Sequence, residues 1–152
     1  MKRFLIFLLL ALAGSAGFSQ SAQKLTDLIS TKEATWADAG WLIAVQNELC
    51  EDKASAEEAY NLIKENGYLN HKKEPSKDDK IKLQDFALLC TKANGIKGGL
   101  FLRLTRSPRY ASRELKAMGV VPNNAAPHQI VSGKQMIDIL SSCEYEQQEA
   151  SK

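Results

Sequence analysis

The strongest constraint on the fold is a helix–loop–helix pattern that the sequence repeats with a period of about fifty residues. The first copy pairs residues 55–69 with residues 81–95, and the second pairs 107–121 with 130–143. In each copy the first segment begins at a serine, a preferred helix start, and has a glycine near its end. The second segment carries apolar residues at i, i+3, i+4 and i+7, which is one face of a helix. Such duplication predicts helical units that bury their apolar faces against each other.

The two copies also agree position by position. Ser55 and Gly67 correspond to Ser107 and Gly119 at an offset of 52 residues. At an offset of 50 residues, the apolar stripe of the first copy corresponds to that of the second: Phe86, Leu89, Cys90 and Ala93 align with Met136, Ile139, Leu140 and Cys143.

We therefore expect a small all-α domain of two helix–loop–helix units plus an extra N-terminal helix within residues 34–50. A chain of 152 residues with 44% apolar residues is sufficient for one modest core. We place this domain at residues 25–143 and expect residues 144–152 to be a polar, frayed tail. The connector over 95–104 has an apolar run that fits either a short helix or a short strand.

The N-terminus has the pattern of a secretory signal peptide. A positive start, Met1 to Arg3, precedes the apolar run 4–14 and then small residues. We predict a signal peptide over 1–19, cleaved after Ala16 or Ser19. The run is short of the ~20 apolar residues that a membrane-spanning helix needs, although a retained N-terminal anchor is the alternative. The expected location is the periplasm or cell envelope, with no membrane span after cleavage.

Positive charge is concentrated in one short stretch. The chain has 20 basic and 18 acidic residues, and loss of Lys2 and Arg3 would leave 18 of each. A near-neutral chain argues against nucleic-acid binding. Apart from Arg3, however, every arginine lies within 103–113. Guanidinium groups pair with carboxylates and phosphates in bidentate geometry, so we take the following as candidate binding residues: Arg103, Arg106, Arg109, Arg113 and Lys116.

This cluster has two interpretations. Arg109, Arg113 and Lys116 fall at i, i+4 and i+7 of a helix begun by Ser107, which places them on one outer face. On the first interpretation, this face binds an anion or an acidic partner. Alternatively it is a solvated face, with Arg103 or Arg106 paired to an acidic residue of the same chain: Asp78, Asp79 or Asp85.

No pattern in the chain predicts catalysis. His71 and His128 lie in polar loops far apart in sequence, and residues 132–134 lack the glycine spacing of a phosphate-binding loop. The spacing of the three cysteines matches no metal motif. We therefore expect no catalytic residue, no metal centre and no cofactor. Cys90 is expected to be buried, and Cys50–Cys143 is the disulfide pair to test first.

The residues "GYL", the loop after them and "IKLQDFALLCTKANGI" resemble the S-layer homology (SLH) module. The matching positions include Gly67, Ile81 and Phe86, and the second copy matches more loosely through Gly119 and Val131. Residues 107–140 are also similar to N-terminal modules of spirochaetal cell-envelope proteins, some of which carry peptidoglycan-binding domains elsewhere.

This resemblance implies an exported, noncatalytic cell-envelope module that binds cell-wall glycan, peptidoglycan or another anionic envelope component. In the family, a Thr-Arg-Ala-Glu stretch contributes to binding a negatively charged polysaccharide. The corresponding residues here, 82–85 and 132–135, contain no arginine, so the arginines of 103–113 are expected to take that role. The alternative is a periplasmic structural or interaction subunit that docks an acidic protein partner. The oligomeric state stays open.

Overall fold

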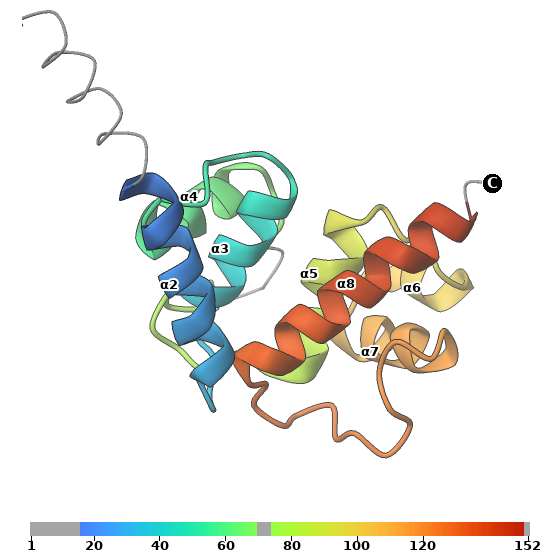
Figure 1. The fold of residues 1–152 in the computed structure, drawn as a ribbon. Coiled ribbons are helices and arrows are strands. Elements are labelled where there is room, and N and C mark those ends of the chain that lie inside the picture. The colour runs from blue at the N-terminus through green and yellow to red at the C-terminus, as the bar shows by residue number, and fades with distance from the viewer. Residues whose placement is uncertain (1–15, 70–73, 151–152) are drawn as a thin grey trace, which may run out of the picture.

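A computed structural model describes residues 16–69 and 74–150 of the chain, and these residues form helices and no strands (Figure 1). The all-α class predicted from the sequence is confirmed. The helices in chain order are α2 (Ala16–Ser30), α3 (Trp36–Gln46), α4 (Ala56–Glu65), α5 (Leu83–Ala93), α6 (Leu100–Thr105), α7 (Pro108–Ala117) and α8 (Gly133–Ala150).

Both predicted helix–loop–helix units are present, and a further unit lies at the N-terminus. The predicted copies are α4 with α5 and α7 with α8, and the expected extra N-terminal helix is α3. Helix α2 precedes α3, so these two helices make a further helix–loop–helix unit. The sequence patterns did not indicate α2, because its first residues overlap the predicted signal peptide (1–19) and no glycine marks its end. Residues 16–19 lie in the first turn of α2, and residues 1–15 of the predicted signal peptide lie outside the described residues.

Three buried residues join the units through a closed cycle of backbone hydrogen bonds. The amide of Ala34 donates to the carbonyl of Val131 (2.9 Å), Val131 donates to Ile81 (3.2 Å), and Ile81 donates to Ala34 (3.0 Å). All three side chains are fully buried. Each of these residues lies in the short extended segment that leads into α3, α5 or α8. The cycle therefore places the starts of the three helices around one centre.

A second set of hydrogen bonds gives a partner to the first backbone amide of α3, α5 and α8. The first N–H groups of an α-helix have no partner within the helix. Here Trp36 donates to Asp79, Leu83 donates to Gln129 and Gly133 donates to Thr31, at 2.9–3.0 Å. Each acceptor lies two or three residues before a member of the central cycle. Each unit therefore completes the helix start of a neighbouring unit.

The helices pack in pairs around this centre: α3 against α4, α5 against α7, and α8 against α2. In Figure 1 the blue N-terminal helix α2 and the red C-terminal helix α8 approach each other where α8 begins. The contact is close at Gly133, where a Cβ atom would lie 1.8 Å from the carbonyl oxygen of Leu28. Gly133 is thus required by the close packing of the backbone between the first and last units.

The predicted apolar stripes form the core. Phe86, Met136 and Cys143 are fully buried, together with the other stripe residues except Ala93, which is half-buried. Gly67 and Gly119 end α4 and α7 with φ of 75° and 78°, a left-handed conformation that glycine adopts without strain. Ser55 accepts a hydrogen bond from the Glu58 amide (3.1 Å) as a helix cap.

Two further segments can be compared with their predictions. The connector over 95–104 forms α6, a helix rather than a strand. Residues 144–150 continue α8, which corrects the expectation of a frayed tail for these positions. The physical reason is that this segment consists of Glu, Gln, Ala and one Tyr, with no glycine or proline to end the helix.

The expected Cys50–Cys143 disulfide is not formed, and all three thiols are free. Cys143 lies against Cys90 instead, and both are fully buried. Burial, and then the thiol of Cys143, raise the pKa of Cys90 well above its ordinary value. The spacing of cysteines along the sequence did not indicate this contact between α5 and α8.

Candidate functional site

The structure divides the five predicted binding residues into three groups. All four arginines are exposed. Arg103 and Arg106 line a groove beside α6, whereas Arg109 and Arg113 lie on α7 outside that groove. Lys116 bonds its ammonium group to the carbonyls of Asn123 (3.0 Å) and Ala125 (2.6 Å). Lys116 therefore holds the loop after α7, and its assignment as a binding residue stays a prediction.

The groove has a volume of about 660 Å³ and lies where the ends of α4 and α5 meet α6. Two sides of the groove are formed by sharp turns of the chain, at Gly67 after α4 and at Gly95 after α5, both with positive φ. Helix α6 forms the third side, and its buried residue Leu102 anchors it to the core. The residues that line the groove are Asn66, Gly67, Tyr68, Leu88, Thr91, Lys92, Gly95, Ile96, Lys97, Leu102, Arg103 and Arg106.

Four of these residues are cations, and none is a carboxylate. They are Lys92, Lys97, Arg103 and Arg106. Two of the four, Lys92 and Lys97, were not predicted. The signal that could have found them is their position: Lys92 occupies the last turn of α5, where the helix dipole favours cations, and Lys97 follows only five residues later. Folding then brings both beside the arginines of α6.

Lys92 is the most constrained of the four. Its ammonium group donates a 2.7 Å hydrogen bond to the carbonyl oxygen of Tyr68. Burial, and secondly the positive charge of Arg106, lower the pKa of Lys92 below its ordinary value. A cation that is partly desolvated and next to another cation gains from an opposite charge nearby. The groove is therefore electrostatically suited to an anion.

The backbone of Arg106 supports the same conclusion. Arg106 caps the end of α6 in the left-handed region, with φ of 46° and ψ of 38°. This conformation strains residues other than glycine. Glycine follows α4, α5 and α7 in the same region, whereas Glu48 follows α3 and Arg106 follows α6. Of these two, Arg106 has a side chain that lines the groove. The strained position is thus occupied by the residue type that binds carboxylates and phosphates best.

The ion pair expected between Arg103 or Arg106 and an acidic residue does not occur among the described residues. Within residues 16–69 and 74–150, the ion pairs are formed by lysines, and none of the four arginines takes part in one. The carboxylate of Asp79, one of the expected acceptors, instead accepts a 2.9 Å hydrogen bond from the backbone amide of Ser76. The guanidinium groups of Arg103 and Arg106 are therefore available to a ligand.

The repeat supplies an internal comparison for this groove. A hollow of about 310 Å³ lies at the corresponding place in the next unit, between the end of α7 and α8. There Gly119 corresponds to Gly67, and Ser142 corresponds to Lys92. Its lining contains no lysine or arginine and includes Glu146. The two places share a backbone origin but differ in charge, so the cations are a property of the first place and not a requirement of the fold.

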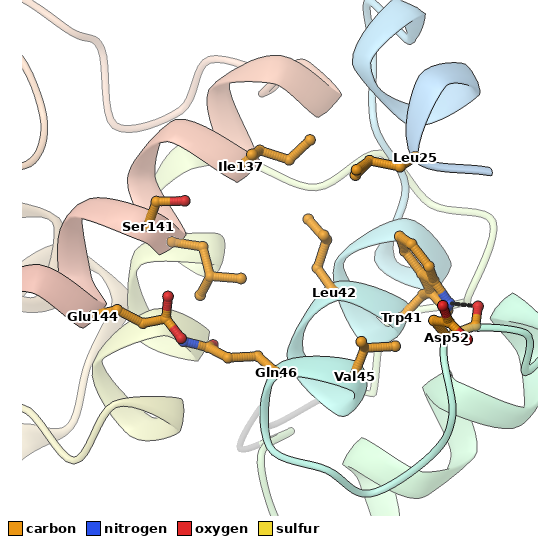
Figure 2. A pocket seen from close by; sticks show the side chains of 10 residues that line it. Leu25, Trp41, Leu42, Val45, Gln46, Asp52, Ile137, Ser141 and Glu144 are labelled. Atoms are coloured by element: carbon orange, nitrogen blue, oxygen red, sulfur yellow. Dashed lines mark hydrogen bonds between the residues drawn. The ribbon is translucent and has the colours of Figure 1, made fainter. Parts of the chain in front are cut away.

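Another hollow, of about 340 Å³, lies where α2, α3 and α8 meet. Figure 2 shows the side chains of Leu25, Leu42 and Ile137 pointing toward one another across it. The indole N–H of Trp41 donates to the carbonyl of Asp52 at 3.1 Å, which directs this side chain to the protein and not to a ligand. Its walls are mainly apolar, include the acidic residues Asp52 and Glu144, and carry no lysine or arginine, so it is unsuited to an anion.

No metal-ligating group of three or more His, Cys, Asp or Glu side chains occurs among the described residues. His128 is exposed in the loop before α8, and His71 lies outside the described residues. In the described part of the chain, no helix combines the length and apolar character needed to cross a membrane. Comparison with protein-family models, with curated proteins and with solved structures returns no match.

Proposed function

We propose that this chain is an exported, noncatalytic, SLH-like module of the cell envelope that binds an anionic cell-wall glycan in the groove between α4, α5 and α6. The observation that carries the proposal is the lining of this groove, which has four cations and no carboxylate. The apparent signal peptide and the similarity of the repeats to SLH modules support the location and the class of ligand.

The chemistry of the groove suits the carboxylates or phosphates of such a glycan. Arg103 and Arg106 offer planar donor pairs, and charge-assisted hydrogen bonds to such groups are about twice as strong as neutral ones. Lys92 and Lys97 add point charges from the end of α5 and the turn after it. Tyr68 lines the same groove, and its hydroxyl group lies 3.3 Å from the amide oxygen of Asn47, so this contact holds an aromatic ring at the site.

Co-sedimentation of the folded protein with purified peptidoglycan, at low and high salt, tests the proposal. We expect binding that weakens as salt screens the charges. The variant Arg103→Gln/Arg106→Gln should bind about tenfold more weakly or worse, because it loses two charge-assisted contacts. Both side chains are exposed, so the helix content should not change.

The matched control is Arg109→Gln/Arg113→Gln, which removes the same charge outside the groove. It should retain most of the binding. Absence of binding by the folded wild-type protein would reject the glycan proposal. Equal loss in both double variants would assign binding to general charge on this side of the molecule. If crosslinking in the native envelope instead captures one acidic protein through Arg103 and Arg106, the alternative interaction subunit takes the place of the glycan proposal.

A further inference from the structure

Helix α6 exposes a group of large apolar side chains that the proposed function does not use. Leu100, Phe101 and Leu104 are 74%, 61% and 79% exposed. At about 100° per residue, these three side chains share one outward face of the helix, opposite the buried Leu102. Exposed apolar residues that occur singly are ordinary, but adjacent ones mark a surface that docks on something.

Arginines flank this apolar face. Arg103 lies on the same helix, Arg106 follows it, and Arg109 and Arg113 lie on α7. All four are exposed, and none forms an ion pair with another described residue. Between residues 100 and 116 the one acidic residue is Glu114, which is half-buried beside Gly98 and Gly99. The face thus has an apolar centre and a cationic border.

Stacked side chains hold the two helices together as one surface. The rings of Phe101 and Tyr110 stack with centroids 5.3 Å apart and an interplanar angle of 12°. The guanidinium carbon of Arg113 lies 5.8 Å from the centroid of the Tyr110 ring. Figure 1 places α6 and α7 at the end of the molecule opposite α2, α3 and α4. The apolar side chains and the arginines are therefore presented together at one extremity.

We propose that the α6–α7 surface docks on a lipid bilayer that contains anionic phospholipid. The leucines and Phe101 would enter the interfacial region, and the arginines would contact the headgroup phosphates. Surface-bound helices of this kind combine a buried apolar face with basic residues at the headgroup level. This inference goes beyond the proposed function, because it concerns the exposed apolar side chains of α6 and a different envelope component. Arg103 and Arg106 lie between the groove and this surface and border both.

Charge and length favour a bilayer over the other occupants. A second copy of the chain docking face to face would bring the two sets of arginines together, which like-charge repulsion opposes. A protein groove that receives a helix normally reads anchors over two turns, at i, i+3, i+4 and i+7. Helix α6 has six residues and offers anchors over little more than one turn.

Binding to vesicles tests the inference, with Leu104→Trp as the reporter. The native Trp36 and Trp41 are 4% and 5% exposed, so a change in fluorescence on binding would come from the added indole. We expect a blue shift with vesicles of phosphatidylglycerol and phosphatidylcholine and none with phosphatidylcholine alone. The processed chain is used throughout, because the apolar run 4–14 would itself enter lipid.

The discriminating variant is Leu100→Ser/Leu104→Ser, tested by vesicle sedimentation. Both side chains are exposed, so the thermal unfolding midpoint should stay close to that of the wild type. Vesicle binding should fall at least tenfold, while sedimentation with peptidoglycan should be unchanged, which separates this inference from the groove.

Lack of binding by the wild-type protein to the anionic vesicles, or equal binding by the serine variant, would overturn the inference. A concentration-dependent dimer in analytical ultracentrifugation that disappears in the serine variant would assign the face to a second copy instead and would also overturn it.

Discussion

The ammonium group of Lys92, in the last turn of α5, lies 2.7 Å from the carbonyl oxygen of Tyr68, the residue that follows the glycine ending α4. This bond joins the two helices of one unit of the repeat at the wall of the cationic groove. In the next unit the corresponding residues are Ser142 and Val120, and no lysine is present to make the bond. The groove therefore arises where one copy of a repeated structure acquired charge.

The charge of Lys92 should respond to Arg106. Arg106 is the second cause, after burial, of the lowered pKa of Lys92. Replacing it in Arg106→Gln removes a like charge, so the pKa of Lys92 should rise toward its ordinary value. A ¹³C NMR titration of the lysine side chains measures the pKa of Lys92 in the wild type and in the variant.

The affinity for an anion should also depend on pH through Lys92. A bound anion favours the charged form of Lys92, so the pKa of Lys92 should be higher in the complex than in the free protein. Affinity should consequently fall as pH rises through the lowered pKa of free Lys92. An unchanged pKa of Lys92 in both Arg106→Gln and the complex would argue that the cations of the groove are electrostatically independent.

Arg106→Gly should stabilise the fold while weakening binding. Glycine adopts the left-handed conformation of this position without strain, and we expect a gain of about 1 kcal/mol in the free energy of unfolding. Urea denaturation measures the gain, and peptidoglycan sedimentation measures the loss of affinity. A variant that is less stable than the wild type would mean that Arg106 is held there by its contacts within the fold rather than for a ligand.

Gly133→Ala should destabilise the protein strongly. The added Cβ would overlap the backbone carbonyl of Leu28 at 1.8 Å, so the junction of α2 and α8 must open. The expected loss is about 3 kcal/mol in the free energy of unfolding, at the upper end for overpacking. Gly99→Ala is the control, because its Cβ meets only the Glu114 carboxylate at 3.4 Å. Equal stability of the two variants would contradict the contact between the first and last units.

The thiols should differ in reactivity according to their burial. Cys90 and Cys143 are fully buried, and Cys50 is half-buried. A thiol reagent such as DTNB should modify one cysteine in the native protein and all three in denaturant. Because burial raises the pKa of Cys50, its native reaction should be slower than that of a small free thiol at the same pH. Rapid modification of Cys143 in the native state would contradict the packing of α5 against α8.

Sequence patterns predicted the local structure well and the long-range structure only partly. Ser55, Gly67 and the apolar stripes are local signals, since capping and periodicity act within a few residues, and the structure confirms them. The third unit was missed because α2 lacks a glycine stop and overlaps a segment typical of signal peptides. The cycle of Ala34, Ile81 and Val131 joins residues about fifty or about a hundred positions apart, and no local signal reports such pairing.

The candidate site was predicted in part for the same reason. Arg103 and Arg106 were found from composition alone, because arginine is concentrated there. Lys92 and Lys97 belong to the site only through the turn at Gly95, which brings the end of α5 beside α6. Lys116 was assigned to the binding face from helical spacing, but its long side chain reaches the carbonyls of Asn123 and Ala125 in its own loop.

Glycan binding in the groove between α4, α5 and α6 is tested most directly by an NMR titration of the ¹⁵N-labelled protein with soluble peptidoglycan fragments. The groove and its counterpart in the next unit lie in one molecule, so each serves as the control for the other. We expect amide shifts at residues 66–68 and 91–97 that saturate with ligand, and none at residues 118–120 and 141–146. Shifts confined to the second set, or absent from both sets while the protein remains folded, would contradict the assignment of this groove as the binding site.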